Sequence, residues 1–145
     1  MSTAGLRAQS KTEELPLVWL RRFLALDAAV TAVNGLAYLL ASGPLGRLLG
    51  VGEGLLLGLG AVLALYGAAV GYLAGRPRPA VRAVQAVIET NALWAVLSAV
   101  ALTVWFDDPH TAGWIWIPLQ AVVVGGFALL QYMALRQVRA GAGQD

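Results

Sequence analysis

Polar side chains interrupt four long apolar stretches of the sequence, and these side chains are the residues that could do chemistry. One face of the first stretch carries four polar residues, spaced i, i+4, i+7 and i+11: Asp27, Thr31, Asn34 and Tyr38. An ionisable side chain at the centre of a membrane-spanning helix costs about 2.5–3.5 kcal/mol. Such a residue is therefore expected to have a partner or a function.

The third and fourth stretches carry further lines of polar residues. In the third, Gln85 and Glu89 share one face with Arg82. Asn91 and Trp94 lie on another face of the same stretch. Packing of the helices can turn these lines toward one another and away from lipid. The ligand-binding residues expected on this basis are Asp27, Thr31, Asn34, Gln85, Glu89, Asn91, Trp94 and Gln131.

The two intramembrane acids admit two interpretations. In the first, Asp27 and Glu89 are tied to Arg22 or Arg82, and the amides hold helices together with about 0.6–2 kcal/mol per hydrogen bond. In the second, the acids line a cavity that faces the cytosol, where at least one exchanges protons or holds a polar headgroup. Glu89 is expected to be the buried, titrating acid, because it lies deeper than Asp27. No catalytic residue is assigned, but in an enzyme Asp27 or Glu89 would be the general acid.

The second stretch has small residues on one face instead of polar ones. They recur three or four positions apart and end in a GxxxGxxxG pattern. Small residues let two helix backbones approach closely in a membrane. Packing within the chain, a second copy or a flat lipid-like ligand could cover this face, and the first is favoured. The expected helix-packing residues are Gly60, Ala64, Gly67, Gly71 and Gly75.

The composition indicates a membrane protein. Of 145 residues, 59% are hydrophobic and only 12% are charged, and the mean hydropathy is +0.70. Soluble domains have about 25% charged residues. The net charge of +2, without a basic stripe, excludes a nucleic-acid-binding domain. Because the chain has no Cys and a single His, His110, we expect no disulfide, no metal site and no cofactor.

Each apolar stretch is long enough for one helix across the bilayer. The stretches cover residues 23–42, 54–74, 83–104 and 114–135, each close to the ~20 residues that a spanning helix needs. The sequence thus predicts an all-α, four-helix transmembrane bundle at 17–139. A polar cytosolic tail is expected at 1–16 and a flexible tail at 140–145. Gly43 and Pro44 are expected to end the first span, followed by a membrane-hugging loop or, alternatively, a short interfacial helix.

A weak similarity relates the two halves of the chain. The segment that starts at Asn34 in the first span resembles the one that starts at Asn91 in the third. Tyr72 in the second span and Tyr132 in the fourth also lie in similar surroundings. The fold could therefore consist of two tandem helical hairpins, although Leu and Ala matches also arise from the biased composition.

Basic residues predict the orientation in the membrane. Nine of the ten Lys and Arg residues flank the termini or lie between the second and third spans, and only Arg47 falls on the opposite side. By the positive-inside rule, both termini are expected in the cytosol. Trp105, Trp114 and Trp116 lie near the opposite surface, where aromatic side chains are enriched. We expect a multi-pass protein of the plasma membrane.

Three segments carry a resemblance to other proteins. They are LRRFLALDAAVTAVNGLAYLLASGPLGRLLGVG (20–52), NALWAV (91–96) and LQAVVVGGFALLQYMALR (119–136). The chain resembles the small four-span integral membrane proteins of high-GC actinobacteria, and its nine Arg to one Lys fit such a source. That family has no established activity, so the resemblance implies a fold and no catalytic residue.

Three functions remain open at this point. The favoured one is a protein that binds or transports a lipid-like or small amphipathic ligand in the cavity lined by acids and amides. The second is a non-catalytic accessory or assembly subunit that uses the glycine face. The third is a membrane-embedded general-acid enzyme acting on an apolar, isoprenoid-like substrate. The expected partners are the lipid bilayer, the ligand, and a second copy or a larger membrane complex.

Overall fold

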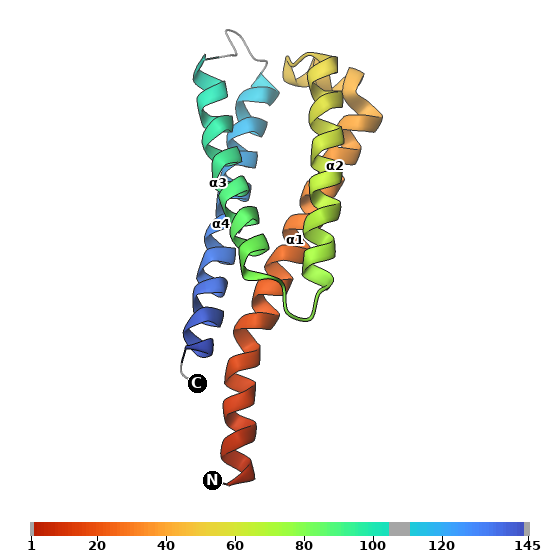
Figure 1. Ribbon diagram of the computed structural model, residues 1–145. Helices are drawn as coiled ribbons and strands as arrows, with labels where there is room; N and C mark the ends of the chain where they lie inside the picture. The colour runs from red at the N-terminus through yellow and green to blue at the C-terminus, as the bar shows by residue number, and fades with distance from the viewer. Residues whose placement is uncertain (1, 105–110, 144–145) are drawn as a thin grey trace.

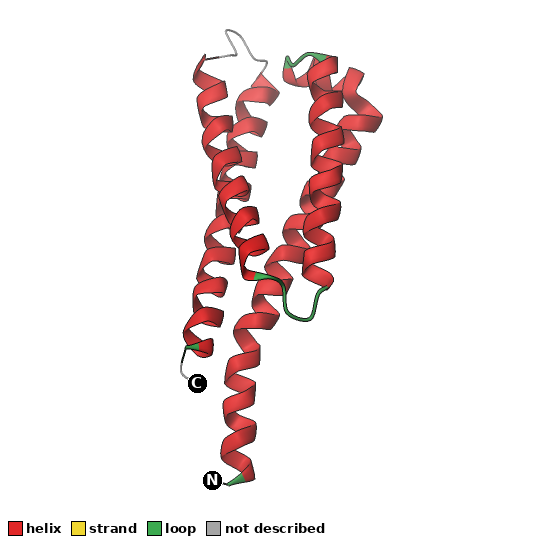
Figure 2. Cartoon of the chain, viewed as in Figure 1, coloured by secondary structure: helices red, strands yellow, loops and turns green. Residues whose placement is uncertain are grey.

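The chain is built from four α-helices. The computed structural model describes residues 2–104 and 111–143. Its helices are α1 (Thr3–Leu49), α2 (Glu53–Gly75), α3 (Val81–Val104) and α4 (Thr111–Ala142), and the described part contains no strand (Figure 2). The prediction of an all-α, four-helix bundle is confirmed. Trp105 and His110, which the sequence singled out, lie outside the described residues.

The helices pair as two hairpins. α1 packs along α2, α3 packs along α4, and the contact between α1 and α4 joins the two pairs. In contrast, the backbones of α2 and α3 approach each other at only a few positions. Both ends of the chain and the connection between α2 and α3 lie at the same end of the bundle (Figure 1). An even number of spans has this consequence, because each hairpin returns the chain to the side from which it started.

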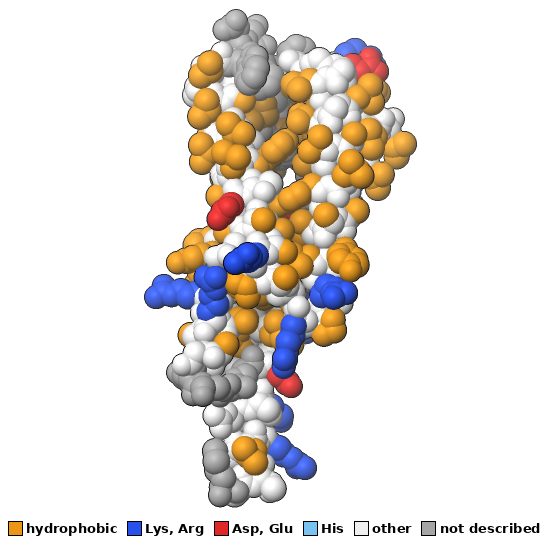
Figure 3. All heavy atoms as spheres, viewed as in Figure 1, with side chains coloured by type: hydrophobic (Ala, Val, Ile, Leu, Met, Phe, Trp, Pro, Cys, Tyr) orange, Lys and Arg blue, Asp and Glu red, His pale blue; other side chains and the backbone are white. Residues whose placement is uncertain are grey.

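The surface of the bundle is the surface of a multi-pass membrane protein. All four helices are long and apolar enough to cross a bilayer. Large apolar side chains face outward, among them Leu40, which is 85% exposed, and Leu65, which is 75% exposed. Figure 3 shows hydrophobic side chains over the upper part of the molecule, whereas most Lys and Arg side chains gather toward the end that holds the termini. Exposure of so many apolar side chains to water is unfavourable, whereas their contact with lipid is not.

Within the expected polar tail, residues 3–16 are helical and form the first part of α1. Ser2 caps the helix, since its hydroxyl accepts a hydrogen bond from the Gly5 amide at 3.4 Å. The following segment is rich in Ala, Leu, Arg, Gln, Lys and Glu, which have high helix propensity. The helix passes through Pro16, and its N-terminal part extends beyond the other helices (Figure 1).

A kink near its C-terminal end changes the direction of α1. Ala41 leaves the helical region, with φ −131° and ψ 29°. Pro44 explains the position, because its ring clashes with the carbonyl of the residue four positions earlier, Leu40. Residues 42–49 then form a further helical stretch that ends at Gly50, whose φ of 72° suits glycine. The expected loop after Gly43 is therefore wrong, and the alternative, a short helix, is what the chain forms.

The small residues of α2 pack against α1 inside the chain. A Cβ built on Gly67 would lie 2.9 Å from the Ala32 amide nitrogen, and one on Gly60 would lie 2.9 Å from the Gly35 carbonyl oxygen. On the opposite helix, a Cβ on Gly35 would lie 2.6 Å from the Ala64 nitrogen. The two backbones are thus in direct contact along this face.

The contact between the two helices weakens toward the end of α2. A Cβ on Gly71 would be 3.6 Å from the Ala28 methyl group, and one on Gly75 would meet nothing within 4 Å. α1 therefore covers the glycine face at Gly60 and Gly67, whereas Gly71 and Gly75 are exposed. The favoured interpretation of this face, packing within the chain, holds for its first part.

Candidate ligand-binding site

Asp27 is the centre of a hydrogen-bond network inside the bundle. Its side chain is 1% exposed. Oδ2 accepts hydrogen bonds from Asn91 Nδ2 at 2.6 Å and from Gln131 Nε2 at 2.7 Å. Oδ1 accepts one from the Thr31 hydroxyl at 3.2 Å, and Asn91 Nδ2 also lies 3.2 Å from Gln131 Oε1. Asp27 therefore connects α1 to both α3 and α4.

Tyr66 brings the remaining helix into the network. Its hydroxyl donates to Asn91 Oδ1 at 3.0 Å, with the Val87 carbonyl as a second acceptor at 3.3 Å. Within the described part of the chain, no buried side-chain nitrogen or oxygen lacks a hydrogen-bond partner. The Asp27 network thus has members on all four helices: Asp27, Thr31, Tyr66, Asn91 and Gln131.

The donors to Asp27 are neutral side chains. Arg22 lies over the ring of Trp19, with 5.3 Å from its guanidinium carbon to the ring centroid. Arg21 Nε donates to the Ala74 carbonyl at 3.1 Å, at the end of α2. Among the residues described, no Lys or Arg hydrogen-bonds to Asp27. The amides of Asn91 and Gln131 are its partners, and not Arg22 or Arg82 as in the ion-pair interpretation. Asp27 lies six positions after Arg21, roughly 9 Å further along the helix.

A cavity of about 250 Å³ lies beside the network, between the two hairpins. Thr31, Tyr66 and Asn91 line it at the network, and Asn34 and Trp94 line it further along. Asp27 itself is not a lining residue, because the side chains bonded to it separate it from the cavity. The other lining residues are mainly apolar: Val30, Val62, Leu63, Thr90, Trp116, Leu119, Gln120, Val123, Val124 and Phe127.

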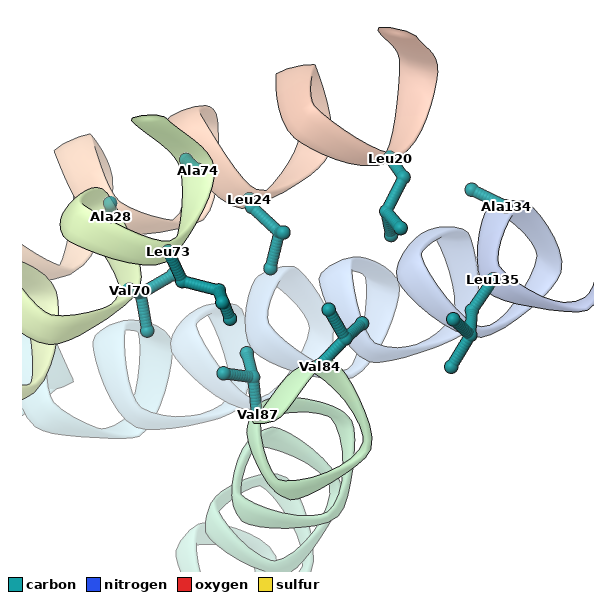
Figure 4. Close-up of a cluster of buried hydrophobic side chains, with 10 residues drawn as sticks. All are labelled: Leu20, Leu24, Ala28, Val70, Leu73, Ala74, Val84, Val87, Ala134 and Leu135. Carbon is teal, nitrogen blue, oxygen red and sulfur yellow. The ribbon is translucent and has the colours of Figure 1, made fainter. Parts of the chain in front are cut away.

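The hydrophobic core lies on the opposite side of the network. It consists of Leu20, Leu24, Ala28, Val70, Leu73, Ala74, Val84, Val87, Ala134 and Leu135, whose side chains converge from all four helices (Figure 4). These residues lie toward the end that carries the termini, whereas the cavity lies in the other half of the bundle. We expected one cavity on the side of the termini, lined by both acids and the amides, but the structure divides these residues. Asn34 and Asn91 line the cavity described above, whereas Gln85 and Glu89 line a second pocket closer to the termini.

The structure separates the two acids. Glu89 is exposed on α3 and lines a different pocket with Gln85 and Tyr132. Arg136 and Arg139 of α4 line the same pocket. The expectation that Glu89 is the buried acid was therefore wrong. The period of the helix turns Gln85 and Glu89 away from the face that holds Asn91, so only one polar line of α3 can enter the interior.

A second hydrogen-bonded group lies further along the bundle and includes residues absent from the expected site. Tyr38 is 5% exposed, and its hydroxyl accepts from Trp116 Nε1 at 2.9 Å and from Gln120 Nε2 at 3.0 Å. Tyr38 lies eleven positions after Asp27, on the polar face that the spacing predicts for the first span, although it was not among the expected ligand-binding residues. Tyr66 carried no such signal, because it and Tyr72 are the only polar side chains in the second span, 54–74, and they form no polar line with other residues.

Comparison with protein-family models, curated proteins and solved structures finds no match. The arrangement of the site itself is therefore the basis for an assignment of function. Among the described residues, no three His, Cys, Asp or Glu side chains lie close enough together to hold a metal ion.

Proposed function

We propose that the protein binds a small amphipathic ligand in the cavity between its two hairpins. The observation that carries the proposal is the cavity of about 250 Å³, which has apolar walls and polar atoms of Thr31, Tyr66 and Asn91 at one end. Ligand sites have this composition, because apolar walls supply affinity and a few placed polar groups fix orientation. The ligand has an apolar body, which lies along α4, and one polar group, which lies at the Asp27 network.

Access from the lipid supports an apolar ligand. Val62 of α2 and Thr90 of α3 line the cavity and are both exposed, and the backbones of α2 and α3 approach each other at only a few positions. The hydrophobic core lies between the cavity and the end with the termini. A ligand therefore enters sideways from the bilayer between α2 and α3 and not along the bundle axis.

The setting that we propose is the plasma membrane, with both termini in the cytosol and the cavity in the outer half of the bilayer. Its support is the distribution of basic residues, nine at the end of the termini against Arg47 at the other end. The resemblance to small four-span proteins of actinobacteria and the preference for Arg over Lys agree with this setting.

Quenching of tryptophan fluorescence by 4-bromobenzyl alcohol tests the proposed function. The probe has an apolar ring, one hydroxyl and a bromine that quenches tryptophan on contact. Trp94 lines the cavity, whereas Trp114 does not line it and is 50% exposed. In chains that retain only one of the five tryptophans, quenching of Trp94 by the probe in lipid nanodiscs should saturate. Quenching of Trp114 should rise linearly, as the probe dissolves in lipid.

A matched pair of substitutions assigns the quenching to the cavity. Val124 lines the cavity, whereas Val122 is 73% exposed to the surroundings. Val124→Phe should fill the site and abolish saturation, while Val122→Phe should leave it unchanged. Linear quenching of Trp94 in the unmodified cavity would show that no binding site exists there and would overturn the proposal.

A further inference from the structure

We infer that the ligand of this cavity is a small organic cation, an amine or quaternary ammonium group with apolar substituents. The inference rests on the proposed function and specifies the chemical class of its ligand. The observation that carries it is the placement of Asp27, whose buried carboxylate is one side chain away from an aromatic-lined cavity.

The partners of Asp27 supply no positive charge. Its two carboxyl oxygens are hydrogen-bonded to the side chains of Thr31, Asn91 and Gln131, which are all neutral. A buried charge without a counter-ion is costly. A cation bound in the cavity would remove much of this cost.

The cavity lies close to Asp27, and the surroundings of both are apolar. Thr31 and Asn91 each hydrogen-bond to Asp27 and also line the cavity. A ligand at this end is therefore separated from the carboxylate by a single layer of side chains, with apolar groups around both. Because the attraction between two charges grows as the dielectric constant falls, it is much stronger here than in water.

Aromatic side chains form part of the cavity wall. Four aromatic side chains line the cavity, and they come from three helices: Tyr66, Trp94, Trp116 and Phe127. Aromatic faces attract cations through their quadrupole, and quaternary ammonium groups are recognised in this way. Among the described residues that line the cavity, none is Lys, Arg or His. An anion would find no attractive charge there, and it would be repelled by Asp27.

Two ligands of equal shape test the inference. Benzyltrimethylammonium and neopentylbenzene differ only in the replacement of a cationic nitrogen by carbon. Their affinities are measured by displacement of 4-bromobenzyl alcohol, with recovery of Trp94 fluorescence as the readout. In the wild type the cation should bind, although a purely apolar cavity would exclude it. In Asp27→Asn, which keeps the shape of the side chain, the cation should bind at least about tenfold more weakly, and the neutral ligand should change less than twofold.

Glu89→Gln is the matched control. It also removes one carboxylate from a membrane-spanning helix, but Glu89 is exposed and lines the other pocket. Both affinities should be unchanged in this variant. An equal loss of cation binding in Glu89→Gln would assign the effect to the overall charge of the protein and overturn the inference.

The outcomes separate this inference from the proposed function. If the bromobenzyl probe does not saturate Trp94, the proposed function fails. If the probe and neopentylbenzene bind but benzyltrimethylammonium does not, the cavity is a ligand site for neutral molecules, and only the inference about the cation fails. This result comes from the wild type alone, so it stands even if Asp27→Asn does not fold.

Discussion

Asn91 Nδ2 of α3 lies 2.6 Å from Asp27 Oδ2 of α1, although the backbones of these two helices do not approach each other. The bond crosses the interior diagonally and connects the two hairpins. The backbones of α2 and α3 approach each other at only a few positions, so side chains connect the hairpins on this side of the bundle. The Asp27 network is thus the polar end of the cavity and, beside the contact between α1 and α4, a second connection between the two halves of the protein.

Removal of the Asn91 amide should therefore destabilise the bundle. Asn91→Ala deprives Asp27 of one donor and Tyr66 of one acceptor, and we expect a loss of about 1–3 kcal/mol in the free energy of unfolding. The effect should be less than additive with Asp27→Ala, because both variants break the same bond. Unfolding by sodium dodecyl sulfate, followed by circular dichroism, measures these values. Glu89→Ala, on the exposed face of α3, is the control, and a loss of equal size there would contradict a specific role for Asn91.

Because α1 and α2 are in direct backbone contact, an added methyl group should destabilise the protein at a glycine in this contact but not at a glycine outside it. Gly35→Ala places a Cβ 2.6 Å from the Ala64 nitrogen and 2.9 Å from the Gly60 carbonyl oxygen, so the backbones must separate. We expect a loss of about 1–3 kcal/mol, as for other overpacked interiors. Gly58→Ala meets nothing within 4 Å and should leave the melting temperature unchanged or slightly raised. Equal melting temperatures for Gly35→Ala and the wild type would mean that these helices do not pack as described.

The hydroxyl of Tyr38 should orient Trp116. Tyr38→Phe removes the acceptor of the Trp116 and Gln120 hydrogen bonds and keeps the ring. The expected loss is about 1 kcal/mol in stability, with a change in the emission maximum of a chain that retains only Trp116. Tyr72→Phe is the control, because Tyr72 is 71% exposed and lies on the outer face of α2. Identical emission spectra for Tyr38→Phe and its parent would argue against the hydrogen bond.

Single cysteines test the orientation, because the natural chain contains none. In right-side-out vesicles, an impermeant maleimide should label Gly52→Cys, between α1 and α2, but not Ser10→Cys or Gly141→Cys. In inside-out vesicles the pattern should reverse. Gly52 and Gly141 lie outside the packed interior, and a Cβ at either position meets nothing within 4 Å, so neither substitution should disturb the fold. Labelling of Ser10→Cys from the outside would place the termini in the opposite compartment.

The site was only partly predictable from the sequence. The face of Asp27, Thr31 and Asn34 follows from helical spacing, as does the separation of Asn91 from Glu89 on α3. Depth along the helices was less reliable, because each span was counted from an estimated start. The sequence thus placed Glu89 deeper than Asp27, whereas Asn91, two positions after Glu89, is in direct contact with Asp27.

The helix ends show the same limit. Pro16 and Pro44 suggest helix boundaries, but α1 passes through both and is kinked only near the second. Proline removes one backbone donor, and whether a helix continues past it depends on the contacts of the flanking turns. Before Pro16 the flanking residues favour helix, so residues 3–16 are part of α1.

The amino-acid sequence by itself determined the fold class, since long apolar stretches in a bilayer must form helices to satisfy every backbone hydrogen bond. It also determined which polar residues share a helix face, because the helical period depends on local geometry alone. Only the tertiary structure decided which faces meet. Asp27 is hydrogen-bonded to amides and not to arginines, and Glu89 is exposed. The cavity lies in the half of the bundle away from the termini. These outcomes depend on how far apart the four helices lie and how they are rotated, and those quantities are set by contacts between residues distant in the chain, such as Gly35 with Ala64 and Asp27 with Gln131.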